Sequence, residues 1–285
     1  MLAALNRYFA KLSKIHLRTM NHIAIISHGH EDLLINSKLG GLLGAKSCRI
    51  WLKDNLPSLK LKSFCAEHDV FYSDVSPGLG FGENNNFLFQ QVEQEIGFTP
   101  EDLFIVMNPD ITISEDTLLA FAEKMHNSQH AIATLNLFRD QAMQVPDTNI
   151  RHFPGVLSII KMPVVNSFSE TYDKEKLAAS LNDIEVEWAS GAFLGFTPEH
   201  YRKLGGFDPA YFMYFEDVDI CYRSRRFFKQ NVHFYPHLKA IHLAAHKNRK
   251  LFSQHAKWFF QSFFQFLLRR YLRSTPAHPS SKVSK

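Results

Sequence analysis

The sequence predicts an α/β fold built on a mostly parallel, doubly wound sheet, and two observations carry this prediction. Over the first 135 residues, apolar strand-like runs alternate with helical patterns. The polar turns SHGHED, SDVSPG and NPD each follow such a run, at the carboxyl ends of strands where sheets of this kind bind ligands. We therefore expect the functional site along this edge of the sheet.

The individual elements follow from local patterns. Strands are expected at 22–29, 48–55, 69–75, 102–110, 188–196 and 232–241, and helices at 33–43 and 86–97. Ser114 is placed to cap a further helix, and Gly205 is placed to end the helix that begins near Thr197. Residues 136–186 are less regular, and we interpret them as an insertion near the site.

Composition limits the class of protein. The 285 residues are 45% hydrophobic and 21% charged, as in a globular protein with a substantial core. The net charge of +4 is too small to indicate nucleic-acid binding, although the chain after Arg223 is rich in cations that suit phosphate or an anionic membrane. Cys48, Cys65 and Cys221 are too scattered for a disulfide framework or zinc site, which favours a reducing cytoplasm. No apolar stretch predicts a membrane span, and no signal peptide is recognisable.

The chain divides by pattern into four parts. Residues 1–19 form an amphipathic extension, and 20–250 form the main domain, with halves at about 20–135 and 136–250. Residues 251–273 are aromatic-rich with interspersed cations, and 274–285 are a polar tail. Two interpretations of 251–273 stay open: a helix lying in a membrane interface, or a helix packed on the domain or on the second copy in a homodimer.

Three further motifs contain groups able to bind or react. Asn108 and Asp110 of NPD follow an apolar strand, and their oxygens suit Mg²⁺ or Mn²⁺, although the motif in isolation favours a strand-ending turn. GLGFGENNN (78–86) suits either a phosphate loop or a structural turn. In AIHLAAH, His242 and His246 would share one face if the segment were helical.

The stretch YFMYFEDVDICYR (211–223) places three acids among aromatic residues. A helix that is apolar on nearly every side is buried, so the acids suggest a cleft containing a cation or a hydroxyl substrate. The alternative is the polar face of a helix, in which Asp219 pairs with Arg223 four residues later.

The order of these motifs resembles family 2 inverting glycosyltransferases of the GT-A fold, in the branch of bacterial rhamnosyltransferases. The resemblance spans about residues 20–270 and rests on GLGFGENNN, NPD, WASGAFLGF with GGFDPAYFMYFEDVDICYR, and AIHLAAH. It implies a single Rossmann-like mixed sheet flanked by helices, with a C-terminal helical extension. The loop SHGHE departs from the Thr/Ser-Tyr-Asn turn that is frequent in the family.

The resemblance also implies roles for individual residues. Asp217 would be the catalytic base, with Glu216 supporting it. Asp110 and His242 would hold Mg²⁺ or Mn²⁺. The implied donor-binding residues are Ser27, Gly80, Gly82, Asn86, Asn108 and Asp110. The implied sugar and acceptor cleft comprises Trp188, Gly191, Ala192 and Tyr214.

The implied reaction moves a sugar from a nucleotide-sugar donor to a hydroxyl of a growing cell-surface polysaccharide or lipopolysaccharide, free or lipid-linked. The implied donor is dTDP-L-rhamnose, and a UDP-hexose or UDP-N-acetylhexosamine is the alternative. A non-catalytic carbohydrate-binding relative is a further alternative, which Asn108 in place of an aspartate favours. The expected location is the cytoplasm, with peripheral contact at the inner membrane.

Overall fold

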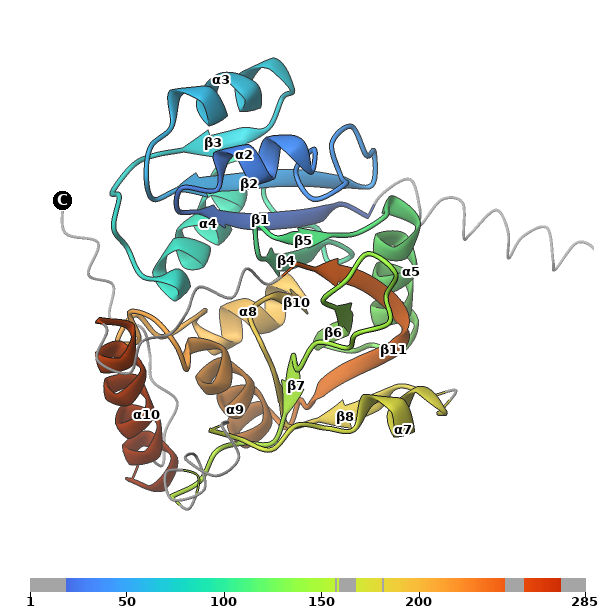
Figure 1. Cartoon of the computed structure of the whole chain (residues 1–285), viewed down its shortest axis with the longest axis vertical. Helices are drawn as coiled ribbons and strands as arrows, with labels where there is room; N and C mark the ends of the chain where they lie inside the picture. Colours follow the sequence, from blue (N-terminus) through green and yellow to red (C-terminus); the bar gives the residue numbers. More distant parts are fainter. Residues whose placement is uncertain (1–18, 157, 159–167, 181, 244–253, 273–285) are drawn as a thin grey trace, which may run out of the picture.

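The central feature of the computed structural model is one mixed sheet (Figure 1). The described residues are 19–156, 158, 168–180, 182–243 and 254–272, so the predicted extension before Thr19, the polar tail and His246 lie outside them. Within these residues, nine strands form one sheet in the order β3-β2-β1-β4-β10-β6-β11-β5, with β8 beside β11. The predicted mixed α/β class is confirmed.

The strand directions explain why the sheet is mixed. Strands β1 to β4 run parallel, β10 is antiparallel to both β4 and β6, and β11 is parallel to β6 but antiparallel to β5 and β8. The strands are β1 Asn21–Ser27, β2 Cys48–Asp54, β3 Phe71–Ser73, β4 Leu103–Met107, β5 Ile111–Thr112, β6 Ile132–Phe138, β8 Ile184–Val186, β10 Phe193–Phe196 and β11 Val232–His242. The short strands β7 (Ile150–Arg151) and β9 (Trp188–Ala189) form a second, two-stranded sheet.

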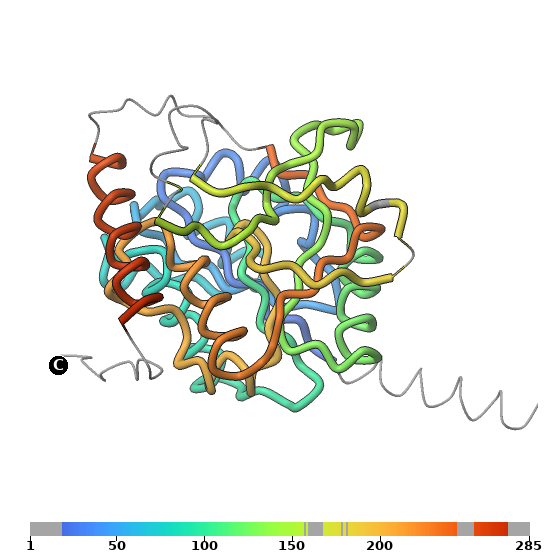
Figure 2. Tube along the Cα trace, turned by 90° about the horizontal axis from the view of Figure 1, so that it is seen from below, coloured from blue at the N-terminus to red at the C-terminus, as the bar shows by residue number. Residues whose placement is uncertain are grey.

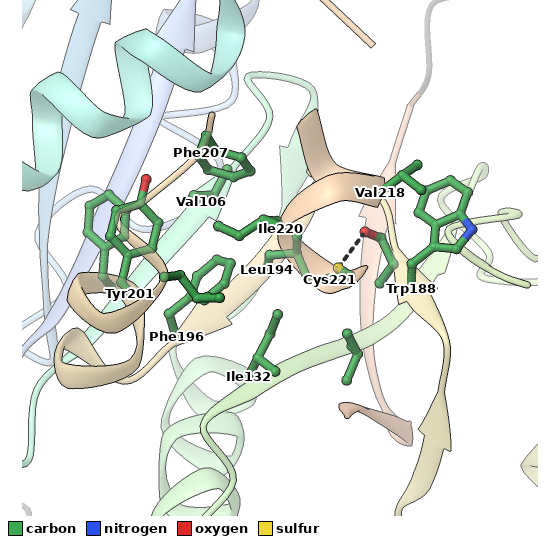
Figure 3. Close-up of a cluster of buried hydrophobic side chains, with 14 of the residues drawn as sticks. Val106, Ile132, Trp188, Leu194, Phe196, Tyr201, Phe207, Val218, Ile220 and Cys221 are labelled. Atoms are coloured by element: carbon green, nitrogen blue, oxygen red, sulfur yellow. Dashed lines mark hydrogen bonds between the residues drawn. The ribbon is translucent and has the colours of Figure 1, made fainter. Parts of the chain in front are cut away.

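Helices cover both faces of the large sheet. The helices are α2 Glu31–Asn36, α3 Leu59–Glu67, α4 Phe81–Glu95, α5 Glu115–Asn127, α7 Lys174–Ala178, α8 Pro198–Leu204, α9 Glu216–Phe228 and α10 Gln254–Leu272. One core contains buried side chains of α4, α8, α9 and α10, and the other contains those of α2, α3 and α5. Figure 3 shows Val218, Ile220 and Cys221 of α9 within the first core, where the Cys221 thiol donates to the Ala189 carbonyl.

Several predicted boundaries were wrong. The expected helix at 33–43 ends at Asn36, because Lys38 to Gly41 all have positive φ. A Cβ on Gly40 would lie 2.6 Å from the Ile111 carbonyl oxygen, so a side chain there would block the approach to β5. The expected helix at 86–97 instead begins at Phe81, which places the glycine-rich motif at the helix start. The caps predicted at Ser114 and Gly205 are confirmed.

Helix α10 packs against α9 and against the loop that precedes α9 (Figures 1 and 2). Phe263 and Phe266 are buried, and both rings contact the ring of Phe215. The Ser262 hydroxyl donates to the Met213 carbonyl over 2.9 Å, which ties the helix to the same loop. Among the described residues, no helix combines the length and apolar character needed to cross a bilayer.

Candidate active site

The NPD turn and the end of β11 meet at one edge of the sheet. β11 runs antiparallel to β5, with His242 opposite Ile111, and the Leu243 amide donates to the Asp110 carbonyl over 3.1 Å. This pairing brings His242 Nε2 to 3.3 Å from Asp110 Oδ1, although the two residues are far apart in sequence. His242 is the last residue of a strand, so the helical arrangement considered for AIHLAAH was wrong at this residue.

The electrostatics of this pair are those of a buried ion pair. Burial alone would lower the pKa of His242, but hydrogen bonds and charges from Asp110 and Asp147 outweigh it and raise the pKa to about 9. Burial alone would raise the pKa of Asp110, but its hydrogen bond to His242 and the charge of that residue lower it overall. Asp110 is therefore a carboxylate at neutral pH.

Asp217 lies at the amino end of α9, beside the turn between β9 and β10. Its Oδ2 accepts a 3.0 Å hydrogen bond from the Gly191 amide, and its Oδ1 accepts one of 2.8 Å from the Val218 amide. Burial raises the pKa of Asp217, and the two amide bonds limit the rise. A carboxylate with a raised pKa is a stronger proton acceptor.

A short path of backbone connects Asp217 with the NPD turn. The Asn108 amide donates to the Ala192 carbonyl over 2.9 Å. Gly191, which binds Asp217, immediately precedes Ala192. This contact continues the antiparallel pairing of β10 with β4. A Cβ on Gly191 would lie 2.8 Å from the Phe81 ring, so glycine is required for this close approach. Asp217 and the NPD turn thus both contact the short segment that leads into β10.

The three acids of the EDVD segment have different surroundings. Asp219 is buried and pairs with Arg223 Nε at 2.7 Å, as the i, i+4 spacing predicts. Glu216 is also buried, and its Oε2 has no hydrogen-bond partner among the residues that the structure describes. Burial, followed by the charge of Asp217, raises the pKa of Glu216 well above its usual range, which favours the protonated form.

The residues before α9 are held in a strained loop. The expected aromatic helix is wrong here, because the helix begins only at Glu216. Tyr214 and Phe215 have φ of 68° and 67°, in the left-handed region that L-residues rarely occupy. The Tyr214 hydroxyl lies 3.1 Å from His255 Nδ1 on α10. Strain of this kind concentrates at functional sites, and here it sets the start of α9 and the position of Asp217.

Other predicted donor residues mainly join elements together. The side-chain NH₂ of Asn86 donates to the Phe207 carbonyl over 2.7 Å. The side-chain oxygen of Asn86 accepts from the Tyr201 hydroxyl and from the Phe207 backbone amide. A Cβ on Gly80 would lie 2.3 Å from the Phe212 carbonyl oxygen, and one on Gly82 would lie 2.7 Å from Phe207. These contacts pack the start of α4 onto the loop before α9.

Two more predicted residues differ in their surroundings. Ser27, at the carboxyl end of β1, is fully buried, and within the described part of the chain its Oγ has no hydrogen-bond partner. Trp188 is only 3% exposed, and its indole N–H donates to the His152 carbonyl over 2.9 Å. The ring of Trp188 therefore belongs to the core beneath the cleft (Figure 3).

Sequence reasoning missed three residues of the site. Asp147 contacts His242, Arg151 is close enough to Asp217 to lower its pKa, and His255 contacts Tyr214. Asp147 and Arg151 lie in the segment interpreted as an irregular insertion, and no motif distinguishes them. The described residues contain no group of three or more His, Cys, Asp or Glu arranged to hold a metal.

Comparison with known proteins assigns the chain to a class of enzyme. A search of protein-family models gives no match. The chain is 34% identical over 258 residues to the rhamnosyltransferase WbbL of Escherichia coli K12, and the alignment covers 90% of this chain and 95% of WbbL. The chain belongs to the WbbL rhamnosyltransferase family.

More distant relatives are also glycosyltransferases. An N-acetylglucosaminyl-diphospho-decaprenol L-rhamnosyltransferase of Mycobacterium tuberculosis is 28% identical, over 68% of this chain and 65% of its own. The hexosyltransferase Agl10 of Haloferax volcanii is 22% identical, over 72% of this chain and 61% of its own. The protein is thus a glycosyltransferase, and the non-catalytic alternative is set aside.

Solved structures show the same fold at 11% sequence identity. GalNAc-T7 with UDP, GalNAc and Mn²⁺ superposes with a TM-score of 0.65 over 88% of this chain, which spans 47% of the GalNAc-T7 chain. The mannosyltransferase PcManGT of Pyrobaculum calidifontis, with GDP-Man and Mn²⁺, gives 0.54 over 91% of this chain and 66% of its own. The predicted GT-A fold of this glycosyltransferase is confirmed.

Proposed function

We propose that this glycosyltransferase transfers L-rhamnose from dTDP-L-rhamnose, with inversion, to a hydroxyl of a growing cell-surface polysaccharide or lipopolysaccharide. The observation that supports the proposal is the chain of contacts from Asp217 through Gly191 and Ala192 to Asn108, because it links the side chain that would accept the proton to the NPD turn. The similarity to named rhamnosyltransferases supports the sugar, and a UDP-hexose or UDP-N-acetylhexosamine is the alternative donor.

The residues at the NPD turn fit a divalent cation. Asp110 Oδ1 is buried and lies 3.3 Å from His242 Nε2, its ion-pair partner. A carboxylate oxygen and an imidazole nitrogen suit Mn²⁺ or Mg²⁺, with water and the donor diphosphate supplying the other ligands. A cation bound there would stabilise the charge that develops on the leaving diphosphate.

Asp217 would act as the base. Its carboxylate takes the proton of the acceptor hydroxyl while that oxygen bonds to the anomeric carbon and the bond from that carbon to the donor phosphate oxygen breaks. The amides of Gly191 and Val218 hold the carboxylate in place. Glu216 would support it, because the raised pKa of Glu216 disfavours a second negative charge beside Asp217.

A donor panel tests the proposed function. We expect the purified protein with Mn²⁺ or Mg²⁺ to release nucleoside diphosphate from dTDP-L-rhamnose faster than from UDP-glucose, UDP-galactose or UDP-N-acetylglucosamine, when a lipid-diphosphate-linked N-acetylhexosamine is the acceptor. EDTA should abolish the release. Faster turnover of a UDP-sugar would replace the proposed donor, and full activity in EDTA would contradict the proposed metal.

The proposal includes a cytoplasmic location with peripheral membrane contact through α10. Phe264, Leu268, Tyr271 and Leu272 follow one helical stripe and are 52%, 59%, 59% and 76% exposed. This stripe suits the interface of an anionic bilayer, where a lipid-linked acceptor would lie. A homodimer through the same stripe is the alternative.

Liposome flotation tests the stripe. We expect the wild type to float with vesicles containing anionic lipid, and the double variant Leu268→Gln/Leu272→Gln to remain at the bottom of the gradient, because the variant removes apolar area without disturbing buried Phe263. Light scattering gives the mass of both proteins. Equal flotation would contradict the membrane contact, and a dimer only in the wild type would favour the alternative.

A further inference from the structure

The imidazole of His242 has a carboxylate at each of its two nitrogens. Nδ1 lies 2.6 Å from Asp147 Oδ2, and Nε2 lies 3.3 Å from Asp110 Oδ1. The first contact is a short hydrogen bond between buried groups. The two carboxylates therefore fix the ring plane, and Asp147 is on the side away from the NPD turn.

Asp147 is itself held firmly. Its amide donates to the Leu137 carbonyl over 2.8 Å, and its Oδ1 accepts from Arg139 Nε at 3.0 Å and from the Thr148 amide at 2.7 Å. Only Oδ2 faces His242. Asp147 is therefore arranged to orient the imidazole through Oδ2, while Oδ1 is held by Arg139 and the Thr148 amide.

A buried lysine, Lys174, holds both ends of the loop that contains Asp147. Lys174 Nζ donates to Asn136 Oδ1 at 3.0 Å, to the Leu137 carbonyl at 3.2 Å and to Asn149 Oδ1 at 2.5 Å. These bonds join α7 to the end of β6 and to the residues just before β7. The two ends of the Asp147 loop are thereby fixed relative to the sheet.

We propose that Asp147, held by Arg139, is the positioning residue that directs His242 Nε2 toward the cation site beside Asp110. The hydrogen bond from Nδ1–H to Asp147 holds the proton of Nδ1 in place, so a cation at Nε2 would displace only the proton on that nitrogen. Such outer partners of a histidine ligand typically change metal affinity by about 10–100-fold. This inference rests on the cation site in the proposed function, and it adds a residue that no motif of the chain indicated.

The substitution Asp147→Asn tests this role with little change in shape. Arg139 and the Thr148 amide both donate to Oδ1, so the asparagine carbonyl oxygen should take that position and turn its NH₂ toward His242. His242 Nδ1 would then have to accept, and the proton would move to Nε2, where it opposes a cation. We expect Mn²⁺ binding to the donor-free protein, measured by electron paramagnetic resonance of free Mn²⁺, to weaken about 10–100-fold.

Two additional measurements separate positioning from general stability. Spin-echo modulation from an imidazole nitrogen should be present for Mn²⁺ bound to wild type and lost in His242→Ala and Asp147→Asn. In Asp147→Asn, a high Mn²⁺ concentration should restore most of the transfer rate. Asp140→Asn is the matched control, because the Asp140 carboxylate accepts from the Gln144 and Val145 amides on the same loop, and its Mn²⁺ affinity should be unchanged.

The outcomes distinguish this inference from the proposed function. Wild-type Mn²⁺ affinity and nitrogen modulation in Asp147→Asn would overturn the positioning role. Absence of nitrogen modulation in the wild type would also overturn it, while sugar transfer that depends on Asp217 would leave the proposed reaction standing. A lowered melting temperature in Asp147→Asn, with weak binding that excess Mn²⁺ does not restore, would make the residue structural and contradict the inference.

Discussion

Replacing Asp217 with asparagine should lower the rate of sugar transfer by about 10²–10⁴-fold, the usual contribution of a general base. The asparagine keeps an oxygen that can accept from the Gly191 or Val218 amide, so the local structure should survive. The donor would still bind, because Asp217 acts on the acceptor hydroxyl. Initial rates of nucleoside diphosphate release, with calorimetry of donor binding, give the two quantities separately.

The matched control for this substitution is Asp116→Asn. Asp116 is exposed in the first turn of α5, so the same chemical change there should leave both rate and donor affinity near wild type. Turnover of Asp217→Asn within tenfold of wild type would remove Asp217 from the role of base. Loss of donor binding would instead place Asp217 in the donor site.

Asp110→Asn should have the second largest effect. Its carboxylate is the acidic group at the NPD turn that faces His242, and the neutral amide would weaken the attraction for a divalent cation. Cations of this kind contribute several kcal/mol to the stabilisation of developing charge, so we expect a loss of about 10²–10³-fold in rate. Mn²⁺ affinity and the Mn²⁺-dependent part of donor affinity should both fall.

EDTA treatment provides the comparison for Asp110→Asn. If Asp110 acts through the cation, chelation should reduce the wild-type rate at least as far as the substitution does, and chelation should add little to the loss in the variant. A variant that binds Mn²⁺ as tightly as wild type, yet transfers slowly, would separate Asp110 from the cation.

The sequence predicted those parts of the fold that depend on local signals. Apolar runs identified β1, β2 and β4, because these strands are buried between helices on both faces. Cap residues identified the start of α5 and the end of α8. The i, i+4 spacing of Asp219 and Arg223 predicted their pairing, since both residues lie on one helix.

Local signals were insufficient wherever distant segments determine the structure. The aromatic run before Glu216 was interpreted as helical, but contacts with α10 hold Tyr214 and Phe215 in a left-handed conformation that their side chains do not favour. Asp147 follows no motif, and its role depends on a hydrogen bond to a residue 95 positions later. The glycines near Gly80 left a ligand loop and a structural turn equally open from sequence, because the close approach of the loop around Phe207 and Phe212 to Gly80 and Gly82 is not visible in the motif itself.

Strand β10 limits how this enzyme can admit its substrates. It is hydrogen-bonded to β4 on one side and to β6 on the other, so the first and second halves of the chain belong to one continuous sheet. A hinge that separated these halves would have to break the central sheet pairing. The two halves would therefore keep their relative positions while donor and acceptor bind and products leave.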